Sequence, residues 1–257
     1  MHQFKRNRRL RVNESIRSLV RENHISENDF IVPLFIVDGK GIKEEILSMP
    51  NYFRYSLDTL KNEIKELWGL GLKSVLLFVK VDDKLKDNYG KEAINPDGLM
   101  QRAVMTIKST CPDMLIMTDV ALDPYSIHGH DGVVEHGEII NDKTIEILSQ
   151  MSVSHAKAGA DFIAPSDMMD GRILCIRKAL EKSGFINTGI MSYSAKYASS
   201  FYGPFRDALN SAPINNQNIP FDKKTYQMDY SNRLEALKET KMDIEEGADI
   251  VMIKPGL

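Results

Sequence analysis

Two lysines close two apolar segments of this chain. Lys196 follows residues 190–195 (IMSYSA), and Lys254 follows residues 250–253 (IVMI). An almost continuous apolar run is typical of a strand that is buried on both faces of a parallel sheet. At the carboxyl ends of two such strands, the lysines would lie where a β/α barrel holds its active site.

The surroundings expected for these lysines favour nucleophilic chemistry. Burial and a second ammonium nearby both disfavour the charged form, lower the pKa of the amine and make it reactive toward carbonyl groups. The pair therefore indicates Schiff-base chemistry with one or two carbonyl substrates. For either lysine alone, the simpler interpretation is a side chain that reaches solvent at a strand end.

A polar loop follows a third apolar segment and carries Asp119, Asp123, His128, His130 and Asp131. Carboxylates suit a hard cation such as Mg²⁺, whereas the HxH spacing is only a weak indication of zinc. A hydrogen-bonded loop without metal is an equal alternative. A metal-dependent hydrolase built on this loop is a third interpretation, but it leaves the two lysines unexplained.

An aromatic, turn-rich segment, residues 201–207 (FYGPFRD), follows Lys196. It could cover a site, with Arg206 as a bidentate clamp for a carboxylate. Lys223 and Gln227 add polar groups further along. The alternative is a packed surface loop with a solvated arginine.

The elements that position these residues alternate along the chain. Helices are expected to start at Ser56, near Asn141 or Asp142, around Ile173 and after Ser231. A Gly-Ala-Asp sequence at 159–161 recurs at 247–249, each time between a helix and a strand. Buried strands are expected at residues 30–37, 74–79, 114–122, 161–165, 188–193 and 249–253. This alternation predicts an α/β fold, and the absence of a GxGxxG motif favours a barrel over a dinucleotide-binding sheet.

Bulk composition excludes several classes of protein. The chain has 257 residues, 42% of them hydrophobic, a net charge of −3 and two cysteines, so no nucleic-acid, membrane or disulfide-rich class is indicated. No apolar run approaches the roughly 18 residues of a membrane helix. A cytoplasmic location is expected. A short basic run at residues 5–11 could bind nucleic acid or act as a transit peptide. The preferred interpretation is an exposed arm that contacts a neighbouring subunit or stays solvated.

Several motifs resemble those of the porphobilinogen synthase (5-aminolevulinate dehydratase) family. The most specific is residues 191–208, MSYSAKYASSFYGPFRDA. The resemblance runs from about residue 5 to the last residue. The other matching stretches are 8–11, 33–35, 118–120, 128–130, 135–137, 161–166, 169–171, 226–228 and 254–256.

The resemblance implies a (β/α)8 barrel of the TIM type, residues 29–257, with an N-terminal arm, residues 1–28. It implies the condensation of two molecules of 5-aminolevulinate to porphobilinogen, with loss of two waters, in a homo-oligomer that is typically an octamer. Lys254 and Lys196 match the two Schiff-base lysines. The residues that match substrate-binding positions are Arg206, Lys223, Gln227, Asp119 and Ser166.

The chain departs from the zinc-type pattern of this family. Ala121, Asp123 and Asp131 stand where that type has cysteines, so zinc is not expected, and the chain resembles members with Mg²⁺ or no metal in the active site. Asp123 and Asp131 remain candidate ligands. Glu235 matches a position linked to an allosteric Mg²⁺. Lys223 stands at a position where many members of the family have arginine. A lysine keeps the positive charge but lacks the forked guanidinium that binds a carboxylate through two hydrogen bonds.

Six strands are expected up to Lys254, whereas a closed barrel has eight. We therefore expect two strand-helix units of the barrel to be missing after Leu257, together with a serine and a tyrosine that the family uses for the first substrate. The alternative function is a truncated, non-catalytic subunit of an oligomer of the same family.

Overall fold

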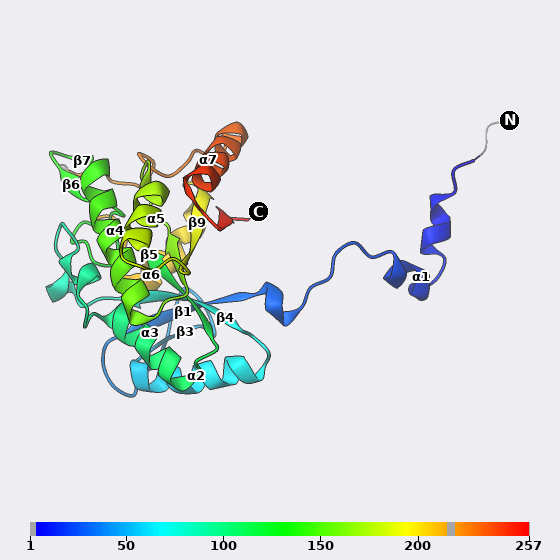
Figure 1. The fold of residues 1–257 in the computed structure, drawn as a ribbon, viewed down its shortest axis with the longest axis horizontal. Helices are drawn as coiled ribbons and strands as arrows, with labels where there is room; N and C mark the ends of the chain where they lie inside the picture. Colours follow the sequence, from blue (N-terminus) through cyan, green and yellow to red (C-terminus); the bar gives the residue numbers. More distant parts are fainter. Residues whose placement is uncertain (1–3, 215–218, 257) are drawn as a thin grey trace.

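Six parallel strands form the centre of the fold, and they are the six that the sequence predicts. The computed structural model describes residues 4–214 and 219–256, and in these residues the sheet order is β10-β9-β8-β5-β4-β1-β3-β2. Each strand-helix unit thus adds its strand beside the previous one (Figure 1). The six central strands are β1 (Ile31–Val37), β4 (Ser74–Lys80), β5 (Leu115–Val120), β8 (Phe162–Pro165), β9 (Gly189–Lys196) and β10 (Ile250–Lys254).

Helices follow the strands and cover one side of the sheet, where α3, α4 and α5 stand side by side (Figure 1). The α-helices are α1 (Glu14–Leu19), α2 (Leu57–Gly69), α3 (Leu99–Thr110), α4 (Asn141–Ala158), α5 (Arg172–Lys182), α6 (Gly203–Leu209) and α7 (Arg233–Glu246). The short strands are β2 (Lys43–Glu45), β3 (Phe53–Tyr55), β6 (Val134–Glu135) and β7 (Glu138–Ile139). The 3-10 turns are Asn7–Arg11, Glu27–Asp29, Asp83–Leu85, Lys91–Ile94 and Ser200–Tyr202.

Both faces of the central strands are buried, which explains their apolar sequences. In β1, Leu34 and Ile36 pack against the helices, while Phe35 packs on the opposite face. In β4, Leu77 faces the helices and Phe78 faces the other side. Successive side chains of a strand point to opposite faces, so an apolar layer on each side requires an unbroken apolar run.

The repeated Gly-Ala-Asp sequence occupies equivalent junctions, as predicted. Gly159 ends α4 with φ +107°, and Gly247 ends α7 with φ +108°. Only glycine adopts this left-handed conformation without cost, and it lets the chain turn directly from the helix into the next strand.

One buried arginine ties α7 to the sheet. Arg172, at the start of α5, lies 3.4 Å from the carboxylate of Asp243 on α7 and 3.5 Å from that of Asp167. It also donates to the carbonyl of Tyr193 in β9 at 3.1 Å. Ser192 in the same strand donates to Asp243 at 2.6 Å. A buried cation shared among three elements holds α7 against β9.

One packing prediction is wrong at the β10 edge. The strand was expected to be buried on both faces, but Ile253 is 60% exposed and Val251 is 37% exposed. On α7, Leu234 and Leu237 are also largely outside the core, 78% and 60% exposed. Periodicity shows that a face is apolar without showing what covers it, and no described segment covers this one. Among the described strands, β10 and β2 form the two edges and do not pair, so the sheet is open.

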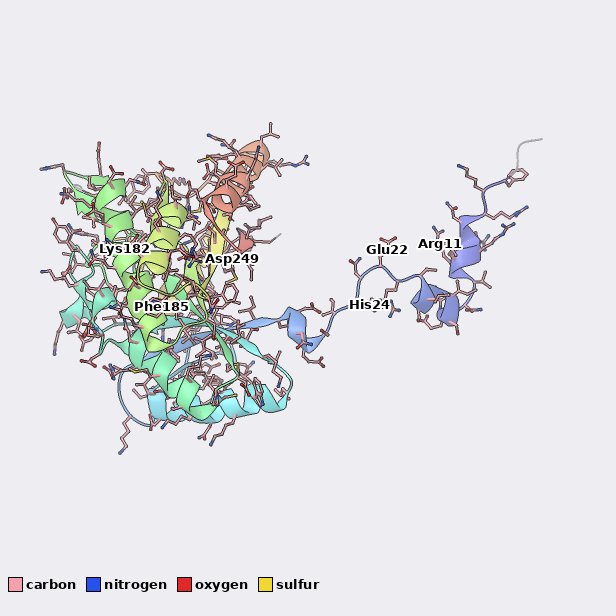
Figure 2. The ribbon with its side chains drawn as sticks, in the orientation of Figure 1. Arg11, Glu22, His24, Lys182, Phe185 and Asp249 are labelled. Carbon is pink, nitrogen blue, oxygen red and sulfur yellow. The ribbon has the colours of Figure 1, made fainter. Side chains whose placement is uncertain are left out.

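The N-terminal segment extends away from the sheet and helices (Figure 1). Arg11, Glu22 and His24 lie along it, far from Phe185 and Asp249 in the body (Figure 2). The predicted arm, residues 1–28, includes residues 1–3, which lie outside the described residues, as does Leu257. Within the described residues, no helix combines the length and the apolar character that crossing a membrane requires.

Candidate active site

The two lysines lie opposite each other at the carboxyl ends of neighbouring strands. Lys196 ends β9, Lys254 ends β10, and the two residues are partners in the parallel register. Their ammonium nitrogens lie 5.7 and 5.3 Å from the ring centre of Tyr193, which is buried beneath them. Both side chains line one pocket of about 50 Å³. The predicted pairing of the lysines is therefore present in the structure.

A β-bulge in β9 places Lys196 on the pocket side. Met252 is opposite Tyr193, but Ile253 is opposite Ala195, so Ser194 is an extra residue in the ladder. Strict alternation from Tyr193 would turn Lys196 toward the helices, because a side chain three residues further points to the other face. The extra residue reverses this and brings Lys196 to the same side as Lys254.

Lys254 has an aromatic environment. Its nitrogen lies 4.0 Å from the ring centre of Phe205 and 5.4 Å from that of Tyr202. Burial, and then the nearby charge of Lys196, lower the pKa of Lys254 to about 8, against the opposing effect of Asp119 and its neighbours. This lysine therefore has a sizeable neutral fraction near neutral pH, as a nucleophilic amine requires.

Lys196 has polar surroundings instead. It donates a short hydrogen bond to the carbonyl of Ser166 and lies 3.5 Å from the carboxylate of Asp131. Ser166 is buried and directly follows β8. The carboxyl ends of three neighbouring strands, β8, β9 and β10, therefore meet at this pocket. The two lysines share a pocket but differ in their contacts.

Asp119 is a buried carboxyl group within the same pocket. Burial, and then the neighbouring Asp123, raise its pKa to about 7, although Lys196 and Lys254 act in the opposite direction. Its Oδ1 atom has no hydrogen-bond partner among the described residues. A carboxyl group that titrates near neutral pH can accept and return a proton during a reaction.

Asp131 and Asp123 are held together by Lys223. The Lys223 nitrogen lies 2.6 Å from Asp131 and 3.3 Å from Asp123, and it is buried. Burial opposes the ionised form of Asp131, but the Lys223 and Lys196 ammonium groups outweigh it and lower the pKa of Asp131. Burial alone would lower the pKa of Lys223, and the two carboxylates raise it.

The HxH pair is not arranged as a zinc site. Both ring nitrogens of His130 are engaged, Nδ1 with the Tyr226 hydroxyl at 3.0 Å and Nε2 with the Pro220 carbonyl at 2.7 Å. The imidazole thus anchors the segment around residue 220 to the polar loop. Across the part of the chain that the structure describes, no three His, Cys, Asp or Glu residues are grouped as metal ligands would be.

The predicted carboxylate-binding residues also converge on the pocket. Arg206 on α6 and Gln227 line it together with Lys223, and the Oε1 atom of Gln227 has no partner among the described residues. On α6, Ala208 and Leu209 pack against the sheet face that carries Phe35 and Phe78, opposite the face covered by α3, α4 and α5. The segment around Arg206 therefore lies along the pocket, as the sequence suggested. The pocket residues that the sequence did not single out include Phe78, Tyr193, Leu209 and Ser211.

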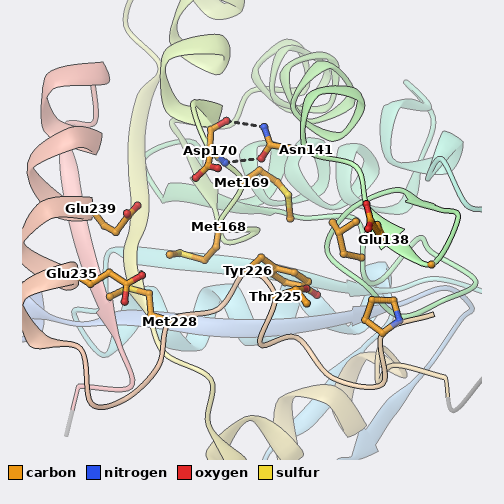
Figure 3. A pocket seen from close by; sticks show the side chains of 13 residues that line it. Glu138, Asn141, Met168, Met169, Asp170, Thr225, Tyr226, Met228, Glu235 and Glu239 are labelled. Atoms are coloured by element: carbon orange, nitrogen blue, oxygen red, sulfur yellow. Dashed lines mark hydrogen bonds between the residues drawn. The ribbon is translucent and has the colours of Figure 1, made fainter. Parts of the chain in front are cut away.

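Glu235 lies in a second, larger cavity of about 520 Å³. In Figure 3, Glu235 and Glu239 project from α7 toward Met168 and Met228, with Tyr226 and Asp170 nearby. Glu235 accepts a hydrogen bond from Asn232 at 2.8 Å. Burial, and then Asp243, raise the pKa of Glu239. This cavity is separate from the lysine pocket, since no residue lines both.

Comparison with known proteins gives consistent similarities. Residues 4–257 match the family described as delta-aminolevulinic acid dehydratase. A protein of that name from Methanothermus sociabilis is 52% identical, over 99% of this chain and 77% of the relative. Its namesake from Bacillus subtilis is 48% identical, over 99% and 76%. The crystal structure of the Toxoplasma gondii enzyme with porphobilinogen bound is similar with a TM-score of 0.95 and 49% identity, over 99% of this chain and 72% of that chain.

Proposed function

The chain belongs to the delta-aminolevulinic acid dehydratase family and condenses two molecules of 5-aminolevulinate to porphobilinogen, and we propose that Lys254 and Lys196 each form a Schiff base with one substrate. One observation carries this proposal. The two lysines are register partners at the ends of adjacent strands, in one pocket, and the Lys254 amine has a pKa of about 8. Activating both ketone substrates as imines takes one amine for each, within reach of the other.

The bonds made and broken follow from Schiff-base chemistry. The neutral Lys254 amine attacks the ketone carbon of one substrate, the ketone oxygen leaves as water, and an imine joins the nitrogen to the substrate. Lys196 does the same with the second substrate. These are the two waters lost overall. Both amines are released when a substrate carbon and a substrate nitrogen replace them, which forms the carbon–carbon and carbon–nitrogen bonds of the product.

Asp119 is the proposed proton carrier for these steps. Its pKa of about 7 means that it is present both as acid and as base near neutral pH. Asp119 lies close enough to Lys196 and Lys254 for their positive charges to act on its pKa, in the lowering direction. A protonated imine acidifies the adjacent carbon of the substrate, and the ionised form of Asp119 can take that proton.

Arg206, Lys223 and Gln227 are the proposed contacts for the carboxylate of the second substrate, with Ser166 beside the reacting atoms. The guanidinium of Arg206 supplies a paired donor, and the Gln227 amide supplies another. Lys223 has three N–H donors, of which Asp131 and Asp123 occupy two. The third remains for the substrate.

The test is to trap the imines. The protein is incubated with 5-aminolevulinate and borohydride, which reduces an imine to a stable amine, and the adduct is mapped by peptide mass spectrometry while porphobilinogen is assayed. Adducts are expected on Lys254 and Lys196. The Lys254→Arg variant keeps a cation but should lose its adduct and the product.

Lys182 provides the matched control, because it is an exposed lysine at the end of α5 (Figure 2). Lys182→Arg should form product as the unaltered protein does. An adduct on exposed lysines such as Lys182, with none on Lys254, would contradict the assignment of the nucleophile.

Mg²⁺, the homo-oligomer and the cytoplasmic location stay predictions. For Mg²⁺ bound at the α7 cavity, Glu235 and Glu239 would supply carboxylate oxygens and water would complete the shell. Bound there, the ion would neutralise the acidic helix face and stabilise α7 without touching the substrate. Glu235→Gln should weaken Mg²⁺ binding measured by calorimetry, whereas Glu245→Gln, on an exposed position of the same helix, should not.

A further inference from the structure

The buried aspartates of the pocket already have a cation. Lys223 lies 2.6 Å from Oδ1 of Asp131 and 3.3 Å from Oδ2 of Asp123. The other oxygen of Asp131 faces Lys196 at 3.5 Å. Two carboxylates that are buried away from water need positive charge beside them. Here that charge comes from the ammonium groups of Lys223 and Lys196.

The position of Lys223 is determined by several contacts of its own segment. The backbone N–H of Gln227 donates to the Lys223 carbonyl at 2.8 Å. Next to it, the Tyr226 hydroxyl accepts a hydrogen bond from the N–H of Asp131 at 3.3 Å and contacts His130 at 3.0 Å. The segment that carries the lysine is therefore joined to the loop that carries the aspartate, independently of the ion pair.

An ammonium and a divalent ion cannot share this place. Mg²⁺ binds carboxylate oxygens at about 2.0–2.1 Å and needs near-octahedral ligands around it. The Lys223 nitrogen already lies within hydrogen-bonding distance of both carboxylates, and a like charge beside it would be repelled. Asp123 and Asp131 thus do not fit a metal site while Lys223 lies between them.

We propose that Lys223 is the resident cation of the active site, and that it takes the place between Asp123 and Asp131 where a divalent metal ion would otherwise bind. This inference rests on the proposed function only in calling the pocket an active site. It predicts that the aspartate pair binds no divalent ion in the unaltered protein and becomes a metal site once the ammonium is removed.

Mn²⁺ is the probe, and free Mn²⁺ is counted by electron paramagnetic resonance during titration of the protein. Lys223→Ala is expected to bind one equivalent more than the unaltered protein. The double variant with Asp131→Asn is expected to lose that equivalent. Lys224→Ala removes an exposed lysine next in sequence and should bind as the unaltered protein does. Mn²⁺ bound elsewhere, for instance at Glu235, is common to all variants and cancels.

A second comparison does not depend on the folding of Lys223→Ala. Asp131→Asn alone should bind as much Mn²⁺ as the unaltered protein, because the aspartate pair holds none. One equivalent fewer would overturn the proposal, as would a Lys223→Ala variant that is folded by circular dichroism yet gains nothing. Because binding is measured without substrate, failure of this proposal is distinguishable from failure of the Schiff-base assignment, which is tested by adduct mapping.

Discussion

Lys254 should react with amine-directed reagents at a pH at which ordinary lysines hardly react. With a pKa of about 8, about a tenth of its side chain is neutral at pH 7 and roughly nine tenths at pH 9. A lysine with the usual pKa near 10.4 is neutral to well under about 0.1% at pH 7. The neutral fraction of Lys254 at pH 7 should therefore be larger by a factor of a few hundred, and it should level off above pH 9.

Competitive labelling measures this directly. A trace of acetic anhydride is added at each pH, the remaining amines are labelled in denaturant, and the extent of the first label on each peptide is quantified by mass spectrometry. Exposed Lys182 serves as the internal reference. Lys196→Met should move the midpoint of Lys254 upward, because it removes the positive charge nearby, but not to the usual value, because burial remains.

The outcome that refutes this reasoning is a Lys254 reactivity that keeps rising about tenfold per pH unit through pH 10, as an ordinary lysine does. An unchanged midpoint in Lys196→Met would show that burial alone lowers the pKa. A loss of labelling at every pH would mean that the amine is inaccessible, which is checked with the substrate and borohydride.

The lowered pKa of Lys254 also affects stability, because between pH 8 and about 10.5 the folded protein binds fewer protons than the unfolded chain. The free energy of unfolding therefore rises with pH across that window. Lys254→Met should stabilise the protein at pH 7 by up to about 3 kcal/mol, measured by urea unfolding, and should abolish activity. Asp119→Asn should lower kcat by about 10²–10⁴-fold and remove the limb of the pH profile near pH 7, and a normal profile would exclude it as the proton carrier. Arg172→Met should destabilise the fold by about 3–5 kcal/mol, because buried carboxylates including Asp243 lose their cation, and the added Asp243→Asn change should recover part of the loss. Arg206→Lys should raise KM for 5-aminolevulinate about tenfold, since about 1.4 kcal/mol is lost with the paired contact, and the adduct on Lys254 should still form.

The long strands could be predicted because burial on both faces leaves a simple record in the sequence. β4 is apolar from Val75 to Val79, and every one of these residues is buried. The strands of two or three residues, β2, β3, β6 and β7, were not predicted, because such short segments have no periodicity to detect. The exposure of Leu234 on α7 shows the opposite limit, since an apolar stripe does not reveal its partner.

The site was predictable in its residues but not in its geometry. Lys196, Lys254, Asp119 and Arg206 were named from their places at strand ends or in motifs, and the structure brings them into one pocket. The orientation of Lys196 depends on the bulge at Ser194, and a single extra residue in a ladder leaves no signature in the pattern. The contact of Lys223 with both aspartates likewise joins residues about 100 positions apart.

The difference between the two lysines matters for a reaction that uses the same substrate twice. If both amines had the same surroundings, two molecules of 5-aminolevulinate would be activated identically, and nothing would decide which one supplies the attacking carbon and which the nitrogen. Lys254 is surrounded by the rings of Phe205 and Tyr202, whereas Lys196 contacts the carbonyl of Ser166 and the carboxylate of Asp131. An imine cation next to a carboxylate is stabilised more than one beside aromatic rings. The asymmetry of the product therefore has a physical counterpart in the unequal charge around two equivalent strand ends.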